Sequence, residues 1–123
     1  MGRALSETSA GDGMTPIQRT RTRPRPEREI QRVILDWLKL QGIFAWRQNT
    51  GAVTEGKRFI RFSIPGCADI LGVLPGGRFL ALEVKRPGHP PTPEQYAFLR
   101  SIERAGGLAA VVTSLEDAMA VLR

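Results

Sequence analysis

The sequence ILGVLPGGRFLALEVK, which occupies residues 70–85, decides the fold. Apolar residues dominate both halves of the stretch, and the turn Pro75-Gly76-Gly77 separates them. Two apolar runs around a glycine-containing turn are typical of antiparallel β-strands joined as a hairpin. With Gly76 at the centre of the turn, Asp69 is expected opposite Glu83. Directly opposed residues point to the same face of a sheet, so the two carboxylates are expected side by side.

Lys85 is two residues beyond Glu83 in the same strand and is therefore expected on the same face. Two close carboxylates repel each other unless a proton or a cation lies between them. A divalent metal held by Asp69 and Glu83 would lower the pKa of a bound water and polarise phosphoryl oxygens. Lys85 would orient or deprotonate the nucleophile, or stabilise the negative charge that develops. The pattern indicates phosphodiester hydrolysis; the alternative is a surface salt bridge, which the apolar neighbours Leu82 and Val84 disfavour.

The cysteine and histidine content restricts the kind of metal site. Cys67 is the only cysteine and His89 the only histidine, so an intramolecular disulfide and a Cys/His zinc site are both excluded. Any metal must be a hard cation held by carboxylates, which favours Mg²⁺ or Mn²⁺.

The composition is that of a small basic protein. The 123 residues carry a net charge of +6, which favours polyanionic partners without separating DNA from RNA or an acidic membrane. No apolar run approaches the length of a membrane span, and the first residues lack the apolar block of a signal peptide. We therefore expect no membrane association and a cytoplasmic location in a prokaryotic or phage-infected cell.

Apolar spacing and turn residues divide the chain into a tail and one domain. Residues 1–25 are rich in Gly, Ser, Thr, Pro and Arg, which predicts a disordered basic tail that either contacts phosphates or improves solubility. Residues 26–123 are expected to form one α/β domain, a mixed sheet flanked by helices. The expected helices span residues 26–41, 93–105 and 115–122, and the expected strands span residues 43–47, 58–64, 70–74, 79–85 and 108–113, with a loop at residues 48–57.

Several short motifs, taken in order, resemble the virus-type replication-repair nuclease (VRR-NUC) family of the PD-(D/E)XK superfamily. They are Glu27-x-x-Ile30-Gln31, Trp46-Arg47-x-Asn49-Thr50-Gly51, Gly66-x-Ala68-Asp69-Ile70, Glu83-Val84-Lys85 and Thr92-x-Glu94-Gln95. The resemblance covers about residues 27–122. It implies a restriction-endonuclease-like core and a Mg²⁺- or Mn²⁺-dependent nuclease that acts on branched or Holliday-junction-like DNA in replication and repair. It also implies a homodimer.

Matched position by position, the resemblance assigns roles within the site. Asp69 and Glu83 would ligate the metal together with the Val84 carbonyl, Lys85 would be the catalytic lysine, and Gln95 would position the water or the scissile phosphate. The sequence departs from the superfamily's usual Pro-Asp motif, because Ala68 precedes Asp69. That proline shapes the start of the strand and supplies no chemistry, so activity is expected to survive the change.

The first helix is expected to supply one more acid. Glu27 lies near the face of Ile30 and Gln31, whereas Glu29 is turned about 100° from Ile30, so Glu27 is chosen as the additional catalytic and metal-binding acid. The alternative is that both glutamates are only favourable charges at a helix N-terminus.

Five residues are candidates for nucleic-acid binding: Gln31, Arg47, Asn49, Lys57 and Arg58. Arg47 and Asn49 follow a predicted strand and are either phosphate contacts or a polar pair at its end. Lys57 and Arg58 form either a DNA-facing loop or a solvated surface. At the level of the whole chain, two alternatives to a nuclease stay open: a catalytically silent nucleic-acid-binding module of the same fold, and a protein whose basic charge is incidental.

Overall fold

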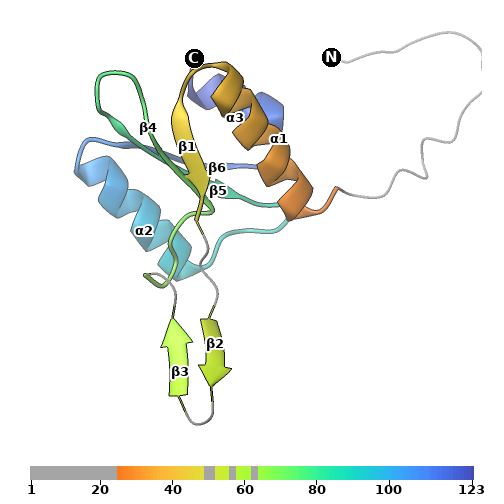
Figure 1. Cartoon of the computed structure of the whole chain (residues 1–123), viewed down its shortest axis with the longest axis vertical. Coiled ribbons are helices and arrows are strands. Elements are labelled where there is room, and N and C mark those ends of the chain that lie inside the picture. The colour runs from red at the N-terminus through yellow and green to blue at the C-terminus, as the bar shows by residue number, and fades with distance from the viewer. Residues whose placement is uncertain (1–24, 49–51, 56–57, 62–63) are drawn as a thin grey trace, which may run out of the picture.

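A four-stranded mixed sheet forms the centre of the computed structural model, which describes residues 25–48, 52–55, 58–61 and 64–123 (Figure 1). The strand order is β1-β4-β5-β6, with β4 antiparallel to both of its neighbours and β6 parallel to β5. The strands are β1 (Phe44–Arg47), β4 (Ile70–Val73), β5 (Phe79–Val84) and β6 (Leu108–Val112). The predicted α/β architecture is therefore confirmed.

The hairpin of β4 and β5 has the register predicted from its turn. Ile70 pairs with Leu82 and Val73 pairs with Phe79, which is the register centred on Gly76. Gly76 has φ 95°, a left-handed conformation that glycine adopts without steric cost. The turn therefore sets which residues face each other farther along the hairpin, at the end where Asp69 and Glu83 are found.

Three helices cover the two faces of this sheet: α1 (Glu27–Leu40), α2 (Pro93–Arg104) and α3 (Leu115–Val121). Helices α1 and α3 lie on one face and α2 on the other (Figure 1). None of the helices in the described part of the chain is long and apolar enough to span a membrane. The segment after β5 crosses the sheet through α2 and returns as β6, which is the connection that a parallel strand pair requires.

The predicted helix boundaries follow from capping chemistry. Thr92 and Gln95 form a reciprocal capping box at the start of α2, and the Ser114 side chain accepts a hydrogen bond from the Asp117 N–H at the start of α3. Pro26 is the N-cap of α1, one residue before the first helical turn in which it was expected. Gly42, with φ 77°, follows the end of α1 as predicted.

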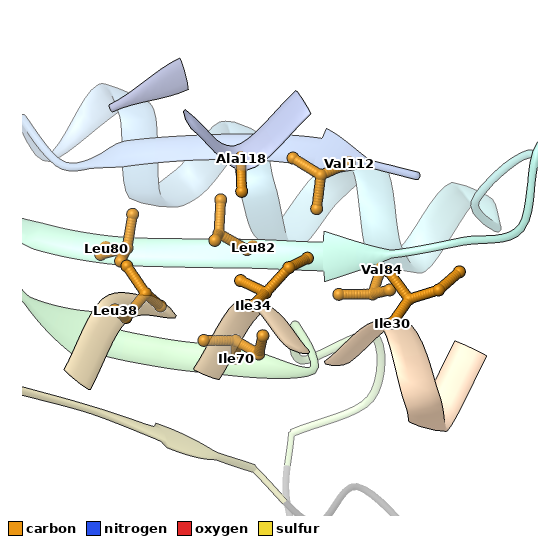
Figure 2. Packing of buried hydrophobic residues seen from close by; sticks show 9 residues of the cluster. All are labelled: Ile30, Ile34, Leu38, Ile70, Leu80, Leu82, Val84, Val112 and Ala118. Atoms are coloured by element: carbon orange, nitrogen blue, oxygen red, sulfur yellow. The ribbon is translucent and has the colours of Figure 1, made fainter. Parts of the chain in front are cut away.

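Alternating side chains of β5 separate the core into two clusters. Leu80, Leu82 and Val84 pack on the side of α1 and α3, where Ile34 and Leu38 meet them (Figure 2). The intervening Ala81 belongs to the second cluster, against α2. Since β5 is buried on both faces, any charged side chain in it is withdrawn from water.

One predicted loop is wrong in part. Residues 48–57 were expected to be loop, but Ala52–Glu55 forms strand β2, which pairs antiparallel with β3 (Arg58–Arg61) in a separate two-stranded sheet. The glycines around β2 indicated a loop, whereas pairing with β3 provides the ladder that its β-branched Val53 and Thr54 favour. The strand predicted at residues 58–64 was longer than β3. Residues 1–24 of the predicted basic tail, which spans residues 1–25, lie outside the described residues, so its predicted disorder stays a prediction.

The turn before β4 contacts the start of α2 too closely for any side chain. Gly66 has φ +80°, and a Cβ at this position would lie 2.4 Å from the Glu94 carbonyl oxygen and 2.9 Å from the Gln95 nitrogen. These are backbone atoms, which cannot move away by rotamer changes. The contact therefore fixes the segment that leads to Asp69 against the first turn of α2.

We predict that Gly66→Ala is strongly destabilising because it combines left-handed strain with this overlap. Gly88→Ala is the matched control, since Gly88 has φ +84° and open space around its Cβ position. Gly88→Ala is expected to cost about 1–2 kcal/mol, and Gly66→Ala about 1–3 kcal/mol more. Urea denaturation of both variants measures the difference, and equal losses would show that the Gly66 contact contributes nothing.

Candidate active site

The predicted chemical groups lie at one end of the four-stranded sheet. Asp69 immediately precedes β4, Glu83 is the penultimate residue of β5, and Lys85 follows β5 directly. Because Leu82 and Val84 face α1 and α3, the alternation of a strand turns Glu83 toward the side of α2. The register places Asp69 opposite Glu83, so the two acids share that face.

Two backbone hydrogen bonds fix Asp69. Its Oδ2 accepts a hydrogen bond from the Val84 N–H at 2.8 Å. Its carbonyl oxygen accepts one from the Gln48 N–H, just beyond β1, at 2.7 Å. Asp69 is therefore tied to β5 through its side chain and to the end of β1 through its backbone. This leaves Asp69 Oδ1 as the oxygen with no such backbone bond.

Glu83 is the buried polar residue of the described core, with 1% of its surface exposed. Its Oε2 lies 3.6 Å from Lys85 Nζ, and its Oε1 is buried with no hydrogen-bond partner among the described residues. A buried polar oxygen without a partner costs free energy of folding. The arrangement is costly as a structural element, and such a cost is typical of functional sites.

The two carboxyl groups perturb each other's titration. Burial, then the negative charge of Asp69, raises the pKa of Glu83 to about 8, although Lys85 acts in the opposite direction. Burial also raises the pKa of Asp69, against the hydrogen bonds from Val84 and Glu83 and the charge of Lys85. The pair therefore holds a proton near neutral pH when no other cation is bound.

This donor set fits a hard divalent cation. Two carboxylates that resist simultaneous ionisation, one with a buried oxygen lacking a partner, are the groups that such a cation would neutralise. The described residues contain no group of three or more His, Cys, Asp and Glu side chains arranged to hold a metal. The side-chain ligands available in this arrangement are thus Asp69 and Glu83.

Glu27 and Gln95 both lie near this end of the sheet, but each is engaged in the fold. Glu27 Oε2 accepts a hydrogen bond from the Arg86 N–H at 3.3 Å, and its charge contributes to raising the pKa of Asp69. Gln95 Oε1 accepts a hydrogen bond from the Thr92 N–H at 2.8 Å as part of the α2 cap. Glu27 therefore holds the backbone of the segment that follows Lys85, and Gln95 caps the start of α2.

The candidate nucleic-acid contacts are only partly placed. Arg47 is exposed at the end of β1, and Gln31 is half-buried on α1. Asn49 and Lys57 lie outside the described residues. Arg58 belongs to β3, but the structure describes only its backbone.

Two arginines that sequence reasoning did not single out accompany Arg47. A hollow of about 250 Å³ is lined by Pro26, Arg28, Glu29, Arg32 and Arg47. Arg28 and Arg32 are four residues apart on the exposed side of α1, a spacing that places side chains on one face. The spacing of Arg28 and Arg32 was the signal that the sequence offered for a basic helix face. The sequence does not show that β1 ends beside this face of α1.

Comparison with known proteins supports the fold. No protein-family model and no curated protein matches this sequence. The structure is similar to a solved structure described as "VRR_NUC domain", with 21% identity and a TM-score of 0.57 over 78% of this chain and 92% of the other. It is also similar to a "VRR_NUC domain protein", with 19% identity and a TM-score of 0.59 over 81% of this chain and 87% of the other. The predicted restriction-endonuclease-like fold and the resemblance to VRR-NUC domains are confirmed at the level of the fold.

We predict a pH-dependent stability that originates at Glu83. Its pKa in the folded protein, about 8, exceeds the ordinary value of 4.5, so the folded state binds the proton more tightly than the unfolded state. The resulting stabilisation is complete below the ordinary pKa and is lost as the pH rises toward 8. In EDTA, the Tm of the wild-type protein should fall between pH 5 and pH 8, and Glu83→Gln should reduce this fall. An identical pH dependence in Glu83→Gln would contradict the assignment.

Proposed function

We propose that this protein is a member of the VRR-NUC family and a divalent-metal-dependent nuclease that hydrolyses DNA phosphodiester bonds. The observation that carries the proposal is the convergence of Asp69, Glu83 and Lys85 at one end of a sheet whose fold is that of VRR_NUC domains. The chemistry of these three groups matches the needs of phosphodiester hydrolysis, which are an activated water and neutralisation of charge on the phosphorus.

Asp69 and Glu83, with the Val84 carbonyl, would hold Mg²⁺ or Mn²⁺. The chemistry that such a cation would supply there is a lowered pKa of a bound water and polarised phosphoryl oxygens. The Val84 N–H keeps Asp69 Oδ2 in place, so the carboxylate is already oriented before a cation binds. The burial of Glu83 keeps water from screening its charge.

Lys85 brings a positive charge to the same end of the sheet. Its side chain is 16% exposed, and its Nζ lies 3.6 Å from Glu83 Oε2. Its roles are to orient the attacking water and to stabilise the negative charge that develops on the phosphate oxygens. The ion pair with Glu83 holds Nζ near the carboxylates before substrate arrives.

Glu27 and Gln95 support these groups. Glu27 accepts a hydrogen bond from the backbone of Arg86, which immediately follows Lys85, and so steadies the catalytic segment while adding negative charge near Asp69. Gln95 keeps its amide nitrogen for a water or phosphate while its Oε1 caps α2. We assign Glu27 to the site as its extra acid and Gln95 as a positioning group for the water or the phosphate.

The resemblance to VRR-NUC nucleases extends the proposal to the substrate and assembly. We propose branched or Holliday-junction-like DNA as the preferred substrate, a role in replication and repair inside the cell, and a homodimer as the working form. Cleavage of a four-way junction, a flap, a splayed arm and a linear duplex, each with Mg²⁺ and with Mn²⁺, tests the preference directly.

A catalytically silent DNA-binding module is the competing function. The burial of Glu83 argues against it, because a carboxylate with a buried, unpartnered oxygen costs stability and repels phosphates. A module that only binds DNA gains nothing from two acids at its binding surface.

We predict that Lys85→Ala lowers the rate of metal-dependent cleavage by at least roughly 100-fold while DNA affinity is largely kept. Lys39→Ala is the matched control, since Lys39 is exposed in the last turn of α1. Single-turnover cleavage and fluorescence anisotropy measure the two quantities. Cleavage by Lys85→Ala at the wild-type rate would exclude the proposed role of the lysine.

We also predict that Glu27→Gln lowers cleavage by about tenfold or more, as outer-shell changes at metal sites do. Glu29→Gln removes an equal charge from the same helical turn, but Glu29 is exposed and pairs with Arg25 at 4.0 Å. Its cleavage rate should stay close to that of the wild type. Equal effects of the two substitutions would show that Glu27 is only a favourable charge at the helix N-terminus.

A further inference from the structure

Three arginines line the hollow defined above, which lies at the same end of the sheet as the two carboxylates but on its other face. Arg47 pairs with Ile70, which belongs to the core cluster beneath α1 and α3. Directly opposed residues share a face, so Arg47 lies on the α1 side. Arg28 and Arg32 approach it from α1 and complete the lining of the hollow.

The charge of this hollow is not balanced by the fold. Its acidic member, Glu29, pairs with Arg25, and no ion pair joins Arg28, Arg32 or Arg47 to an acid within the described ranges. Like charges that line one hollow repel each other and raise the free energy of the folded protein. Guanidinium groups form charge-assisted, bidentate hydrogen bonds with phosphate oxygens, so an anion of this kind relieves the repulsion.

The hollow is connected to the active site through the backbone. The residue after Arg47, Gln48, donates its N–H to the carbonyl oxygen of Asp69, and α1 also carries Glu27, whose carboxylate reaches the segment after Lys85. The hollow and the carboxylates thus lie on either side of the same sheet end. A polyanion held at both places must pass over that end.

We propose that Arg28, Arg32 and Arg47 bind backbone phosphates of the DNA strand whose scissile phosphate lies at Asp69 and Glu83. This inference rests on the proposed function and adds the path of the strand, which runs over the end of the sheet from the α2 side to the α1 side. Contacts of this kind position a strand without reading its sequence. Substrates truncated on the flank that lies over α1 lose the contribution of the hollow.

Two triple variants with the same change in net charge test the proposal. The first is Arg28→Gln/Arg32→Gln/Arg47→Gln, and the control is Arg100→Gln/Arg104→Gln/Arg123→Gln, whose residues are exposed and outside the hollow. Both are made in the full chain carrying Lys85→Ala, and circular dichroism verifies that each is folded. Fluorescence anisotropy with a labelled duplex and a labelled single strand gives the affinity at several salt concentrations.

The slope of log affinity against log salt is negative. Each lost phosphate contact makes it less steep, by about 0.9 on duplex DNA and about 0.7 on a single strand. The hollow variant should lose about two to three contacts, and the control variant fewer than about one. An unchanged slope in the hollow variant, or an equal loss in the control, overturns the proposal. Dependence on these arginines for binding to phosphatidylserine vesicles, with DNA binding unaffected, overturns it in favour of a membrane surface.

The binding assay separates this inference from the proposed nuclease activity. If no substrate is cleaved with either metal but the slope changes as expected, the hollow is a phosphate-binding site and the nuclease proposal fails. With Lys85 restored, the hollow variant should raise KM with little effect on kcat, because the lost contacts are equally strong in the ground state and the transition state. A fall in kcat with an unchanged KM would contradict a positioning role for these arginines.

Discussion

The structure depends on one buried carboxyl group that faces another. Glu83 lies in a strand covered on both sides, opposite Asp69, and within the described residues Lys85 is the cation paired with it. An ionised carboxylate in this environment is costly, and the raised pKa values of both acids express that cost. The Val84 N–H holds Asp69 next to this strand, and Lys85 supplies positive charge beside Glu83.

The surroundings of the pair explain how the fold tolerates it. The apolar cluster beneath α1 and α3 (Figure 2) anchors β5 through Leu80, Leu82 and Val84, and the alternation of the strand then forces Glu83 to the opposite face. The backbone hydrogen bond from Val84 to Asp69 uses the same strand to hold the partner acid. Core packing therefore provides the free energy that keeps two repelling groups in contact, a trade that is typical of functional sites.

Local signals in the sequence predicted most of the fold and the centre of the site. The Pro-Gly-Gly turn fixed the hairpin register, and the caps Thr92 and Ser114 gave the starts of α2 and α3. Strand β2 was missed because its pairing with β3 outweighs the flanking glycines. The roles assigned to the site residues stay predictions, since they rest on the family resemblance.

Features that arise between elements distant along the chain could not be predicted from local sequence patterns. Arg28 and Arg32 were not singled out in the sequence, and it is the position of β1 beside α1 that makes them part of a basic hollow with Arg47. Likewise, the hydrogen bond between Arg86 and Glu27 joins residues 59 positions apart. Such contacts depend on how the layers pack, which periodicity and capping residues do not specify.

The order of the strands has a consequence for how the site is assembled. The hairpin that brings Asp69 to Glu83 closes a short loop, which is a fast event, whereas the parallel pairing of β6 with β5 needs the whole α2 crossover as its connection. Residue Val111 of that last strand is the register partner of Glu83. We therefore expect the two acids to meet while they are still hydrated and to lose water when β6 pairs with β5. On that order, the closure of the sheet is the step at which the pair takes up a proton or a cation.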